Sequence, residues 1–218
     1  METIRGKHTS FIDSSALFEY LDGYEAVHVD IGTGDGRFVQ HIAQTRPNYR
    51  FVIGIDACRE NLHEVSRRVS ANTLFVIANA LALPQELYGI ATQITINFPW
   101  GSLLSGLTTN DPALMAGLVA LCRPNAGLEV RLNAGALAEI GWSLDEGSSR
   151  IRDVLAENGF QMRLAVALTA ADLKSCPTTW ARRLAFGRDP RAVYLQGANR
   201  VNLTAEMPLI TRMSVPAR

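Results

Sequence analysis

Short apolar runs alternate with stretches of helical periodicity along most of the 218-residue chain. The apolar runs are typical of buried strands and cover residues 26–32, 50–56, 73–79, 93–98, 127–133, 160–169 and 192–201. The helical patterns cover residues 14–21, 36–45, 59–70, 111–122, 148–158 and 178–186. Because strands joined by crossover helices run parallel, the pattern predicts an α/β fold with a seven-stranded, mostly parallel sheet.

Two segments lack a regular pattern within what we interpret as a single domain, residues 1–218. Residues 134–147 are predicted to be an irregular linker, and residues 170–191 form a longer basic stretch that contains a tryptophan. The whole chain has 21 Lys and Arg and 21 Asp and Glu, so its net charge does not indicate a polyanionic partner. From position 174 to 200, however, six cations outnumber Asp189 and give a local charge of +5: Lys174, Arg182, Arg183, Arg188, Arg191 and Arg200.

Cysteine use and hydropathy indicate the compartment. Cys58, Cys122 and Cys176 are far apart and odd in number, which favours free thiols in a reducing environment. The polar start METIRGKHTS is unlike a signal peptide, and no apolar run reaches the roughly 20 residues of a membrane span. We therefore expect a cytoplasmic protein that does not enter a membrane.

A glycine-rich turn follows the first predicted strand. Gly32, Gly34 and Gly36 let the backbone turn tightly and approach a ligand. Asp56 ends the second predicted strand, where its carboxylate can accept both hydroxyls of a ribose. A nucleoside cofactor is therefore expected at this turn.

The residues around the glycines narrow the choice of cofactor. A dinucleotide site would favour glycine at position 37, which here is Arg37. With Asp30 ahead of the glycines, the pattern D-x-G-x-G-x-G is instead typical of S-adenosylmethionine (SAM) methyltransferases. Two alternatives stay open: the turn binds NAD or another nucleotide, or it is a glycine-rich turn that binds no ligand.

The fourth predicted strand ends in Asn97, Phe98, Pro99 and Trp100. Methyl transfer to an exocyclic amine or a hydroxyl needs groups that orient the nucleophile or take its proton, as the N/D-P-P-Y motif does. Here the tyrosine is missing, and tryptophan offers only one donor and a π face. Such a face can hold an extruded base or stabilise a cation. Trp100 is thus predicted to be a stacking surface, or otherwise a hydrophobic plug over the sheet edge.

Four segments together resemble a known family. In order and spacing, VDIGTGDGR, GID, FPWGSLL and TTWARRLAFGR resemble the kanamycin-apramycin resistance methyltransferases. Members of that family methylate N1 of an adenine in helix 44, the decoding site of 16S rRNA in the 30S subunit, and so confer aminoglycoside resistance. The resemblance implies a class I, Rossmann-like methyltransferase fold with an antiparallel last strand, SAM as cofactor, and a monomer that acts on the 30S subunit.

The resemblance also implies roles for individual residues. Trp100 and Trp180 would be the catalytic pair that stacks on a flipped adenine. Asp30 and Gly32 would hold the amino-acid part of SAM, and Asp56 the ribose. The other implied cofactor-binding residues are Gly34, Arg37, Ala57, Ala80, Leu81, Asn97, Phe98, Pro99, Ser102 and Thr178, with Ala57, Ala80 and Leu81 on the adenine of SAM. The implied RNA-binding residues are Arg67, Arg68, Arg183 and Arg188, and residues 134–147 and 170–191 would be substrate-recognition elements.

Two positions depart from the family pattern. Leu81 stands where family members carry an acidic residue, which removes one polar contact to the cofactor. The lysine-rich extension after residues 59–70 is absent, so Arg67 and Arg68 alone would contact phosphates from that surface.

Other interpretations of the same residues stay open. Trp180 is a packing anchor in the alternative interpretation, and its neighbouring arginines are a solvated charged face. At the level of function, the alternatives are a methyltransferase for a small molecule or another RNA, and a SAM-binding protein without catalysis.

Overall fold

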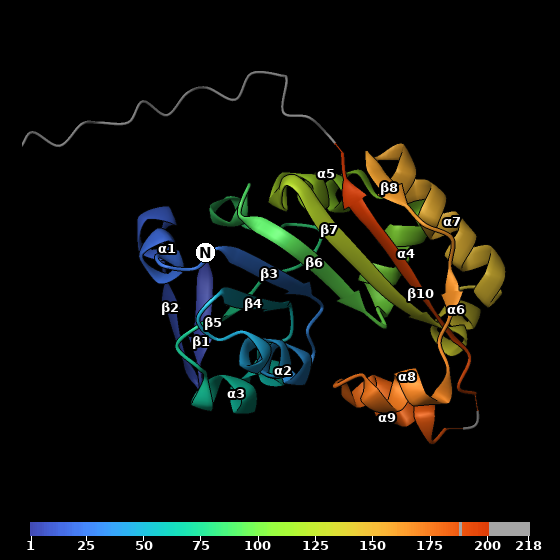
Figure 1. Cartoon of the computed structure of the whole chain (residues 1–218), viewed down its shortest axis with the longest axis horizontal. Coiled ribbons are helices and arrows are strands. Elements are labelled where there is room, and N and C mark those ends of the chain that lie inside the picture. The colour runs from blue at the N-terminus through green and yellow to red at the C-terminus, as the bar shows by residue number, and fades with distance from the viewer. Residues whose placement is uncertain (188, 201–218) are drawn as a thin grey trace, which may run out of the picture.

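The computed structural model describes residues 1–187 and 189–200. In this part of the chain, ten strands form one sheet in the order β2-β1-β5-β4-β3-β6-β7-β10-β8, and β9 pairs with β10 (Figure 1). Parallel pairing joins β5, β4, β3, β6 and β7, whereas β10 runs antiparallel to β7. This confirms the predicted α/β class and the antiparallel last strand. From β1 to β10, the bounds are Glu2–Arg5, His8–Phe11, Ala26–Ile31, Arg50–Asp56, Thr73–Ile77, Ala91–Asn97, Cys122–Asn133, Phe160–Met162, Val166–Ala167 and Ala192–Asn199.

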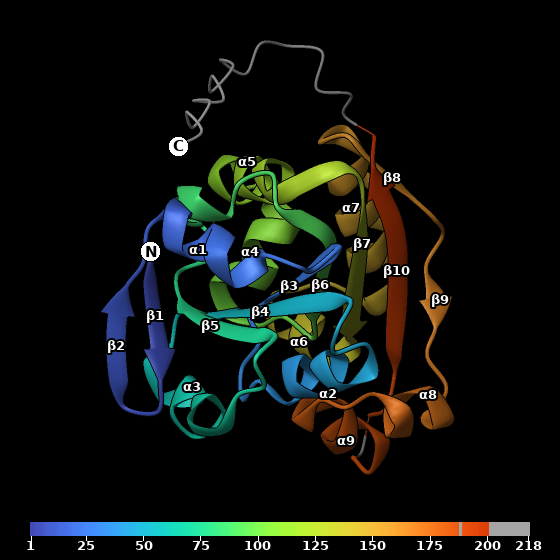
Figure 2. The ribbon, with the colours of Figure 1, turned by 60° about the vertical axis from the view of Figure 1, so that its left-hand side comes forward.

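Helices pack on both faces of this sheet (Figure 2). In the main core, α1, α4, α5, α6 and α7 contribute apolar side chains, while α2 and α3 pack in a second cluster against the other face. From α1 to α9, the helices are Ser14–Leu21, Arg37–Thr45, Arg59–Val65, Gly101–Thr109, Pro112–Leu121, Ala134–Glu139, Leu144–Glu157, Ala170–Ser175 and Thr179–Ala185. A 3-10 turn at Ser66–Arg68 follows α3, so the helix predicted at 59–70 ends early.

The central strand β3 explains why a carboxylate is buried at the edge of the sheet. All six of its residues are buried, and Val27, Val29 and Ile31 face the main core. Because successive side chains of a strand point to opposite faces, His28 and Asp30 face the other side. Asp30 therefore lies near the carboxyl end of a central parallel strand, which is where open α/β sheets bind ligands.

The two ends of the sheet differ from the predicted pattern. The polar N-terminus forms the hairpin β1–β2, which extends the sheet beside β5. The segment predicted as one strand at 160–169 is interrupted, because β8 and β9 pair with opposite ends of β10. Bulges and breaks of this kind are common where a strand has only one neighbour. The last predicted strand, 192–201, ends at Asn199, and residue 201 lies outside the described residues.

The prediction that residues 134–147 form an irregular linker is wrong. Residues Ala134–Glu139 form α6, and α7 begins at Leu144, four residues before the helix predicted at 148–158. The Ser143 side chain caps α7 by accepting a hydrogen bond from the Glu146 backbone N–H. Two further helices have no predicted counterpart: α4, which follows the FPW segment directly, and α8, at the start of the basic stretch.

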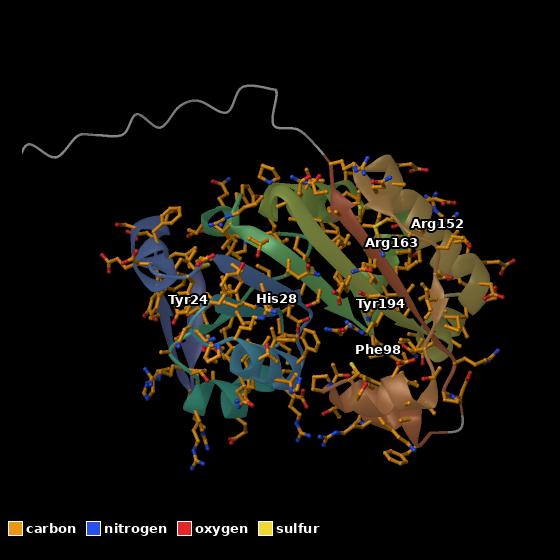
Figure 3. All side chains as sticks on the ribbon, viewed as in Figure 1. Tyr24, His28, Phe98, Arg152, Arg163 and Tyr194 are labelled. Atoms are coloured by element: carbon orange, nitrogen blue, oxygen red, sulfur yellow. The ribbon has the colours of Figure 1, made fainter. Side chains whose placement is uncertain are left out.

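Helices α8 and α9 lie beside the carboxyl ends of the parallel strands (Figures 1 and 2). A small cluster attaches them to the domain, consisting of Phe98, Leu173, Ala181, Leu184 and Ala192. Phe98 is buried in this cluster, and Figure 3 shows it next to the two helices. The basic stretch is therefore packed on the end of β6 and is not a free loop.

Within residues 1–187 and 189–200, no helix is long and apolar enough to cross a bilayer. Nor do the His, Cys, Asp and Glu side chains of these residues gather into a group that could hold a metal ion.

Candidate active site

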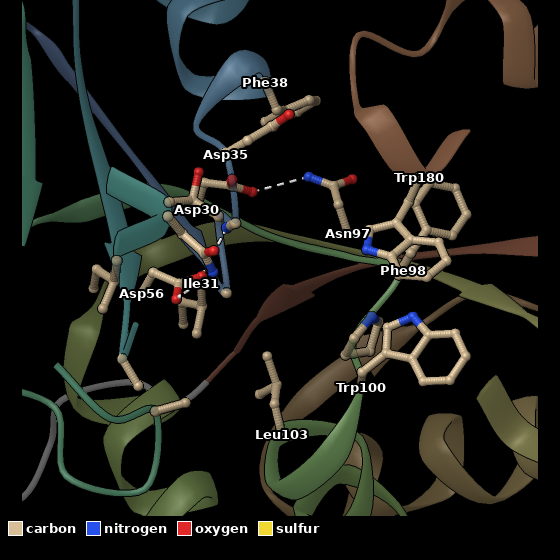
Figure 4. A pocket seen from close by; sticks show the side chains of 18 of the residues that line it. Asp30, Ile31, Asp35, Phe38, Asp56, Asn97, Phe98, Trp100, Leu103 and Trp180 are labelled. Carbon is tan, nitrogen blue, oxygen red and sulfur yellow. Dashed lines mark hydrogen bonds between the residues drawn. The ribbon is translucent and has the colours of Figure 1, made fainter. Parts of the chain in front are cut away.

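The carboxylate of Asp30 lies at the base of a pocket where β3 and β6 end. Its Oδ1 accepts hydrogen bonds from Thr95 Oγ1 at 2.6 Å and from Asn97 Nδ2 at 2.9 Å (Figure 4). Burial raises the pKa of Asp30 to about 6, although these hydrogen bonds and the positive charge of Arg131 oppose the shift. A buried carboxylate of this kind is stabilised in its ionised form by a cationic ligand group.

The glycine-rich turn brings its backbone close to the same pocket. Gly32 has φ +69°, and a Cβ atom there would lie 2.8 Å from Leu103 Cδ2. Gly36 has φ +66°, and a Cβ atom would lie 2.8 Å from both Phe75 and Val65. Only glycine fits both the left-handed backbone and the close contacts at these two positions.

Asp56 joins this turn to the loop after β4. Its Oδ2 accepts from the Gly34 backbone N–H at 2.7 Å, and its Oδ1 accepts from the Cys58 backbone N–H at 2.8 Å. The Asn61 amide adds a weaker contact at 3.3 Å. The carboxylate is thereby fixed in orientation at the pocket wall, where the hydroxyl groups of a ribose could donate to it.

A strained turn ends β6 and directs Trp100 toward the pocket. Phe98 has φ +50°, a conformation that non-glycine residues rarely adopt and that costs of order 1–3 kcal/mol. Its buried ring and the hydrogen bond from its backbone N–H to the Arg131 carbonyl, 2.8 Å, hold it there. Pro99 then leads into Trp100, which is the N-cap residue of α4. The FPW segment therefore serves as a rigid turn at the end of the sheet.

Trp180 from α9 stacks directly on Trp100. The ring centroids are 5.0 Å apart and the planes are inclined by 28°. Figure 4 shows both indoles on one side of the pocket, with Asp30 and Asp56 on the other. Arg183 places its guanidinium 5.2 Å from the Trp180 ring, on the outer part of the same stack.

A hydrogen bond ties α9 to the glycine-rich turn. The Thr179 hydroxyl donates to Asp35 Oδ2 at 2.5 Å, and Thr178 caps the helix by accepting from the Ala181 backbone N–H. The segment that carries Trp180 is thus in direct contact with the turn that would hold a cofactor.

The pocket has the size and chemistry that SAM requires. Its volume is about 480 Å³, within the usual range for small-molecule sites. Asp30 offers a carboxylate for an ammonium group, Asp56 offers one for a ribose, and Ala57 and Ala80 line the wall for an adenine. The residues present therefore fit SAM.

Most of the predicted site residues line this one pocket. The structure brings together Asp30, Gly32, Gly34, Asp56, Ala57, Ala80, Asn97, Phe98, Pro99, Trp100, Ser102, Thr178, Trp180 and Arg183. Arg37 and Leu81 lie outside its lining. Arg37 pairs with Asp35 at 3.3 Å and is half exposed, and Leu81 packs against the main core.

The predicted RNA-binding arginines are divided between two elements. Arg67 and Arg68 lie in the 3-10 turn after α3, where Arg67 pairs with Glu64 at 3.1 Å. Arg183 lies on α9, and Arg188 falls outside the described residues. Figure 2 shows α3, α2 and α9 along the same edge of the molecule.

Three functional candidates were missed by the sequence analysis. Asp35 and Thr179 contact each other across 144 positions of sequence, and Arg131 reaches Asn97 from β7. An available signal for Arg131 was its charge within the apolar alternation GLEVRLN. Nothing in the local pattern links Asp35 with Thr179.

Comparisons with known proteins agree with this geometry. A family model described as NpmA, 16S rRNA (adenine(1408)-N(1))-methyltransferase, matches residues 2–199. A 16S rRNA (adenine(1408)-N(1))-methyltransferase from Escherichia coli is 31% identical over 206 residues, covering 86% of this chain and 94% of the relative.

Solved structures give the same result. The 16S rRNA methyltransferase KamB is 28% identical with a TM-score of 0.82, covering 91% of this chain and 99% of that one. A mutant 16S rRNA (adenine(1408)-N(1))-methyltransferase from Catenulisporales acidiphilia, solved with its cosubstrate SAM, is 25% identical with a TM-score of 0.81, covering 95% and 100%. Since the family model spans nearly the whole chain, the protein belongs to the NpmA family of 16S rRNA (adenine(1408)-N(1))-methyltransferases.

Proposed function

We propose that this enzyme transfers the methyl group of SAM to N1 of adenine 1408 in helix 44 of 16S rRNA, acting as a monomer on the 30S subunit in the cytoplasm, and so confers aminoglycoside resistance. The observation that carries the proposal is the Trp100–Trp180 stack at the mouth of a pocket that contains two cofactor-type carboxylates. Family membership supports the position of the modified base.

Four groups of residues would hold SAM. Asp30 and the Gly32 backbone would bind its amino-acid part, Asp56 the ribose, and Ala57 and Ala80 the adenine. When bound, SAM supplies a methyl group on a positively charged sulfur, which a ring nitrogen with a free lone pair can accept without a general base. This agrees with a pocket mouth made of aromatic rings in place of a tyrosine or histidine.

The tryptophan pair must part to accept a base. Carbon layers pack about 3.5–4.0 Å apart, so a ring–base–ring sandwich spans roughly 7–8 Å. The present separation of 5.0 Å leaves no room between the rings. We infer that the Trp180 ring moves outward by roughly 2–3 Å on binding RNA, which its exposed position permits.

The energetic role of the pair follows from its geometry. Extruding a base costs a few kcal/mol, and each aromatic face returns about 1–3 kcal/mol. Two aromatic faces can therefore offset the cost of extruding the base, whereas a single face would not. Because methylation of N1 leaves a positive charge on the adenine, the same π faces stabilise the product side of the reaction.

RNA would dock along the edge that bears α3, α8 and α9. Arg182, Arg183 and Lys174 lie on α8 and α9, and Arg67 and Arg68 lie beside α3. These cations suit phosphate contacts, which position a protein on RNA without reading its sequence. Residues 134–147, which form α6 and the start of α7, would be a second recognition element beside the same edge.

One assay tests the proposal against its alternatives. The protein is incubated with tritiated SAM and isolated 30S subunits, free 16S rRNA, or no acceptor, and the product is mapped by primer extension. We expect label in 30S subunits and a stop at adenine 1408. Label at another nucleotide would reassign the substrate, and SAM binding without transfer to any of the acceptors would mean a non-catalytic protein.

Substitutions of Trp180 test the stacking role separately. We expect Trp180→Ala to leave SAM affinity, melting temperature and 30S affinity nearly unchanged while turnover falls steeply, because the loss arises when the base is extruded and acquires charge. Trp180→Phe should recover part of the activity, and Trp180→Leu should not. If Trp180 were a packing anchor, truncation would cost roughly 3–5 kcal/mol of stability. A destabilised Ala variant, or a Leu variant as active as Phe, would contradict stacking.

A further inference from the structure

A second groove shares Phe38 of α2 with the pocket described above. It has a volume of about 500 Å³ and is lined by residues of β3, β6, β7, β10, α2 and α8. Arg131 of β7 lies at its centre, with its guanidinium 5.0 Å from the Tyr194 ring and 5.8 Å from the Phe38 ring. Tyr194 also lines this groove and lies toward the end of β10 that is nearer α8 and α9 (Figure 3). The aromatic rings hold the cation in place.

Arg131 determines how the Asn97 amide is oriented. Its Nη1 donates to Asn97 Oδ1 at 2.8 Å, and its Nη2 donates to Glu129 Oε2 at 3.2 Å. A guanidinium has donors only, so the atom of Asn97 that faces it must be the oxygen. The Asn97 NH2 group is thereby turned toward Asp30 Oδ1, 2.9 Å away. With the amide reversed, its oxygen would face the carboxylate and repel it.

A second chain of hydrogen bonds reaches Asp30 from His28. The Thr95 hydroxyl gives its single proton to Asp30 Oδ1 at 2.6 Å, so at the 3.0 Å contact with His28 Nε2 the imidazole must be the donor. Burial, with smaller effects from Arg50 and Arg131, lowers the pKa of His28 to about 3. His28 is therefore neutral above pH 5 and does not add a titration of its own near Asp30.

Charged and titratable side chains from β3, β7, β10 and the adjoining loops lie around Asp30. His28 lies on its own strand, Glu129 and Arg131 on β7, Tyr194 on β10, and Cys176 in the segment before α9. Asp35 and Asp56 line the cofactor pocket from the two loops. Burial has the largest effect on the pKa of Asp30 and raises it, whereas the hydrogen bonds from Thr95, Thr33 and Asn97 and then the charge of Arg131 lower it.

We propose that Arg131 is a positioning residue for the cofactor: by fixing the Asn97 amide and supplying positive charge behind it, Arg131 keeps Asp30 ionised and directed at the ammonium group of SAM. The inference rests on the SAM site of the proposed function and adds a residue that never touches SAM. It predicts a specific change in pH dependence, which a general loss of packing would not produce.

Calorimetric titration of SAM from pH 5 to 7.5 tests this role. The upper limit stays below the α-amino pKa of about 7.7–8.0, so the ligand keeps its charge. For the wild type we expect affinity to fall as pH drops through about 6, where Asp30 takes up a proton. For Arg131→Met we expect the midpoint to move up by about one pH unit, which is roughly a fivefold loss of affinity at pH 6, close to tenfold at pH 5 and a small loss at pH 7.5.

Arg50→Met is the matched control. Arg50 lines the same groove and the substitution removes the same charge, but its guanidinium makes no hydrogen bond to Asn97 among the described residues. In Arg50→Met, the pH midpoint of SAM affinity should stay at the wild-type value. Arg131→Lys keeps the charge but lacks the planar fork, so its midpoint should fall between those of wild type and Met.

A measurement without SAM separates this inference from the proposed function. The carboxyl carbon of Asp30, followed by NMR in the free protein, should titrate about one pH unit higher in Arg131→Met. If SAM does not bind the wild type but this shift occurs, the cofactor assignment fails while the control of Asp30 by Arg131 holds. An unchanged midpoint, or an equal loss of affinity at every pH, overturns the positioning role. If Arg131→Met does not fold, the Lys variant gives the same comparison.

Discussion

At the scale of single residues, the site contains a carboxylate that is unfavourable for the fold. Asp30 is almost fully buried, and burial raises its pKa from the ordinary value of 3.8 to about 6. The folded state therefore holds this proton more tightly than the unfolded chain does. The contribution of the protonated Asp30 carboxyl to the free energy of unfolding is fully present below about pH 4 and is lost as pH rises through about 6. At neutral pH the ionised Asp30 lowers stability, and its proposed role in binding SAM explains why a carboxylate stands there.

Asp30→Asn separates these two effects. The amide oxygen can still accept from Thr95 and Asn97, but no buried charge remains. We expect the variant to be more stable than wild type at pH 7.5, by about 1–3 kcal/mol, with the difference disappearing toward pH 4. SAM affinity should fall about tenfold or more, because a charged hydrogen bond is lost.

Thermal melting at pH 4, 6 and 7.5 together with calorimetry checks this prediction. Asp56→Asn is a useful comparison, since Asp56 is partly exposed and bonded to backbone N–H groups. Asp56→Asn should weaken SAM binding without the gain in stability that we expect for Asp30→Asn. An Asp30→Asn protein that is less stable than wild type at every pH would show that the carboxylate is structural.

At the scale of elements, α9 is held by three contacts with different roles. The Phe98 cluster anchors its apolar side, Trp180 stacks on Trp100, and Thr179 bonds Asp35. The last contact links the glycine-rich turn to the helix that carries Trp180, the ring that we propose moves when a base enters. If the proposed function holds, this one exposed hydrogen bond connects cofactor binding with base placement.

Thr179→Val removes this hydrogen bond at almost constant shape. We expect turnover on 30S subunits to fall about fivefold, corresponding to about 1 kcal/mol, with the melting temperature unchanged. Thr179→Ser should restore activity, since it keeps the hydroxyl. Thr109→Val is the control, because its hydroxyl bonds the Ser105 carbonyl at the end of α4, away from the pocket. Equal turnover in Thr179→Val and wild type would contradict a role for the contact.

Elements with strong apolar patterns could be predicted from the sequence, and edge elements could not. The strands β3 to β6 contain buried apolar runs and β7 alternates buried with partly buried residues, whereas β1 and β2 are polar and gain their order only by pairing beside β5. The motif residues Asp30, Asp56 and Trp100 could be found because each lies at or near the carboxyl end of a predicted strand. Arg131 and Thr179 could not, because their roles depend on partners more than 30 positions away.

At the scale of the whole molecule, charge is balanced overall but is placed unevenly. The edge beside the pocket carries Lys174, Arg182 and Arg183 from α8 and α9, and Arg68 from the turn after α3. Figure 3 shows Arg152 and Arg163 away from this edge, toward the other end of β10 and α7. A negatively charged partner would therefore be oriented with its backbone along the α3 and α9 edge.

The salt dependence of 30S binding measures this orientation. Each phosphate contact releases counterions and contributes about 0.7–0.9 to the slope of log K against log salt concentration. We expect Arg68→Ala and Arg182→Ala each to lower the slope by about that amount, without changing SAM affinity. Arg163→Ala removes an equal charge far from the edge and should leave the slope as in wild type. Because Arg67 already pairs with Glu64, its substitution should lower the slope by less than that of Arg68. Equal slopes for Arg68→Ala, Arg163→Ala and wild type would mean that this surface carries solvated charge and that docking occurs elsewhere.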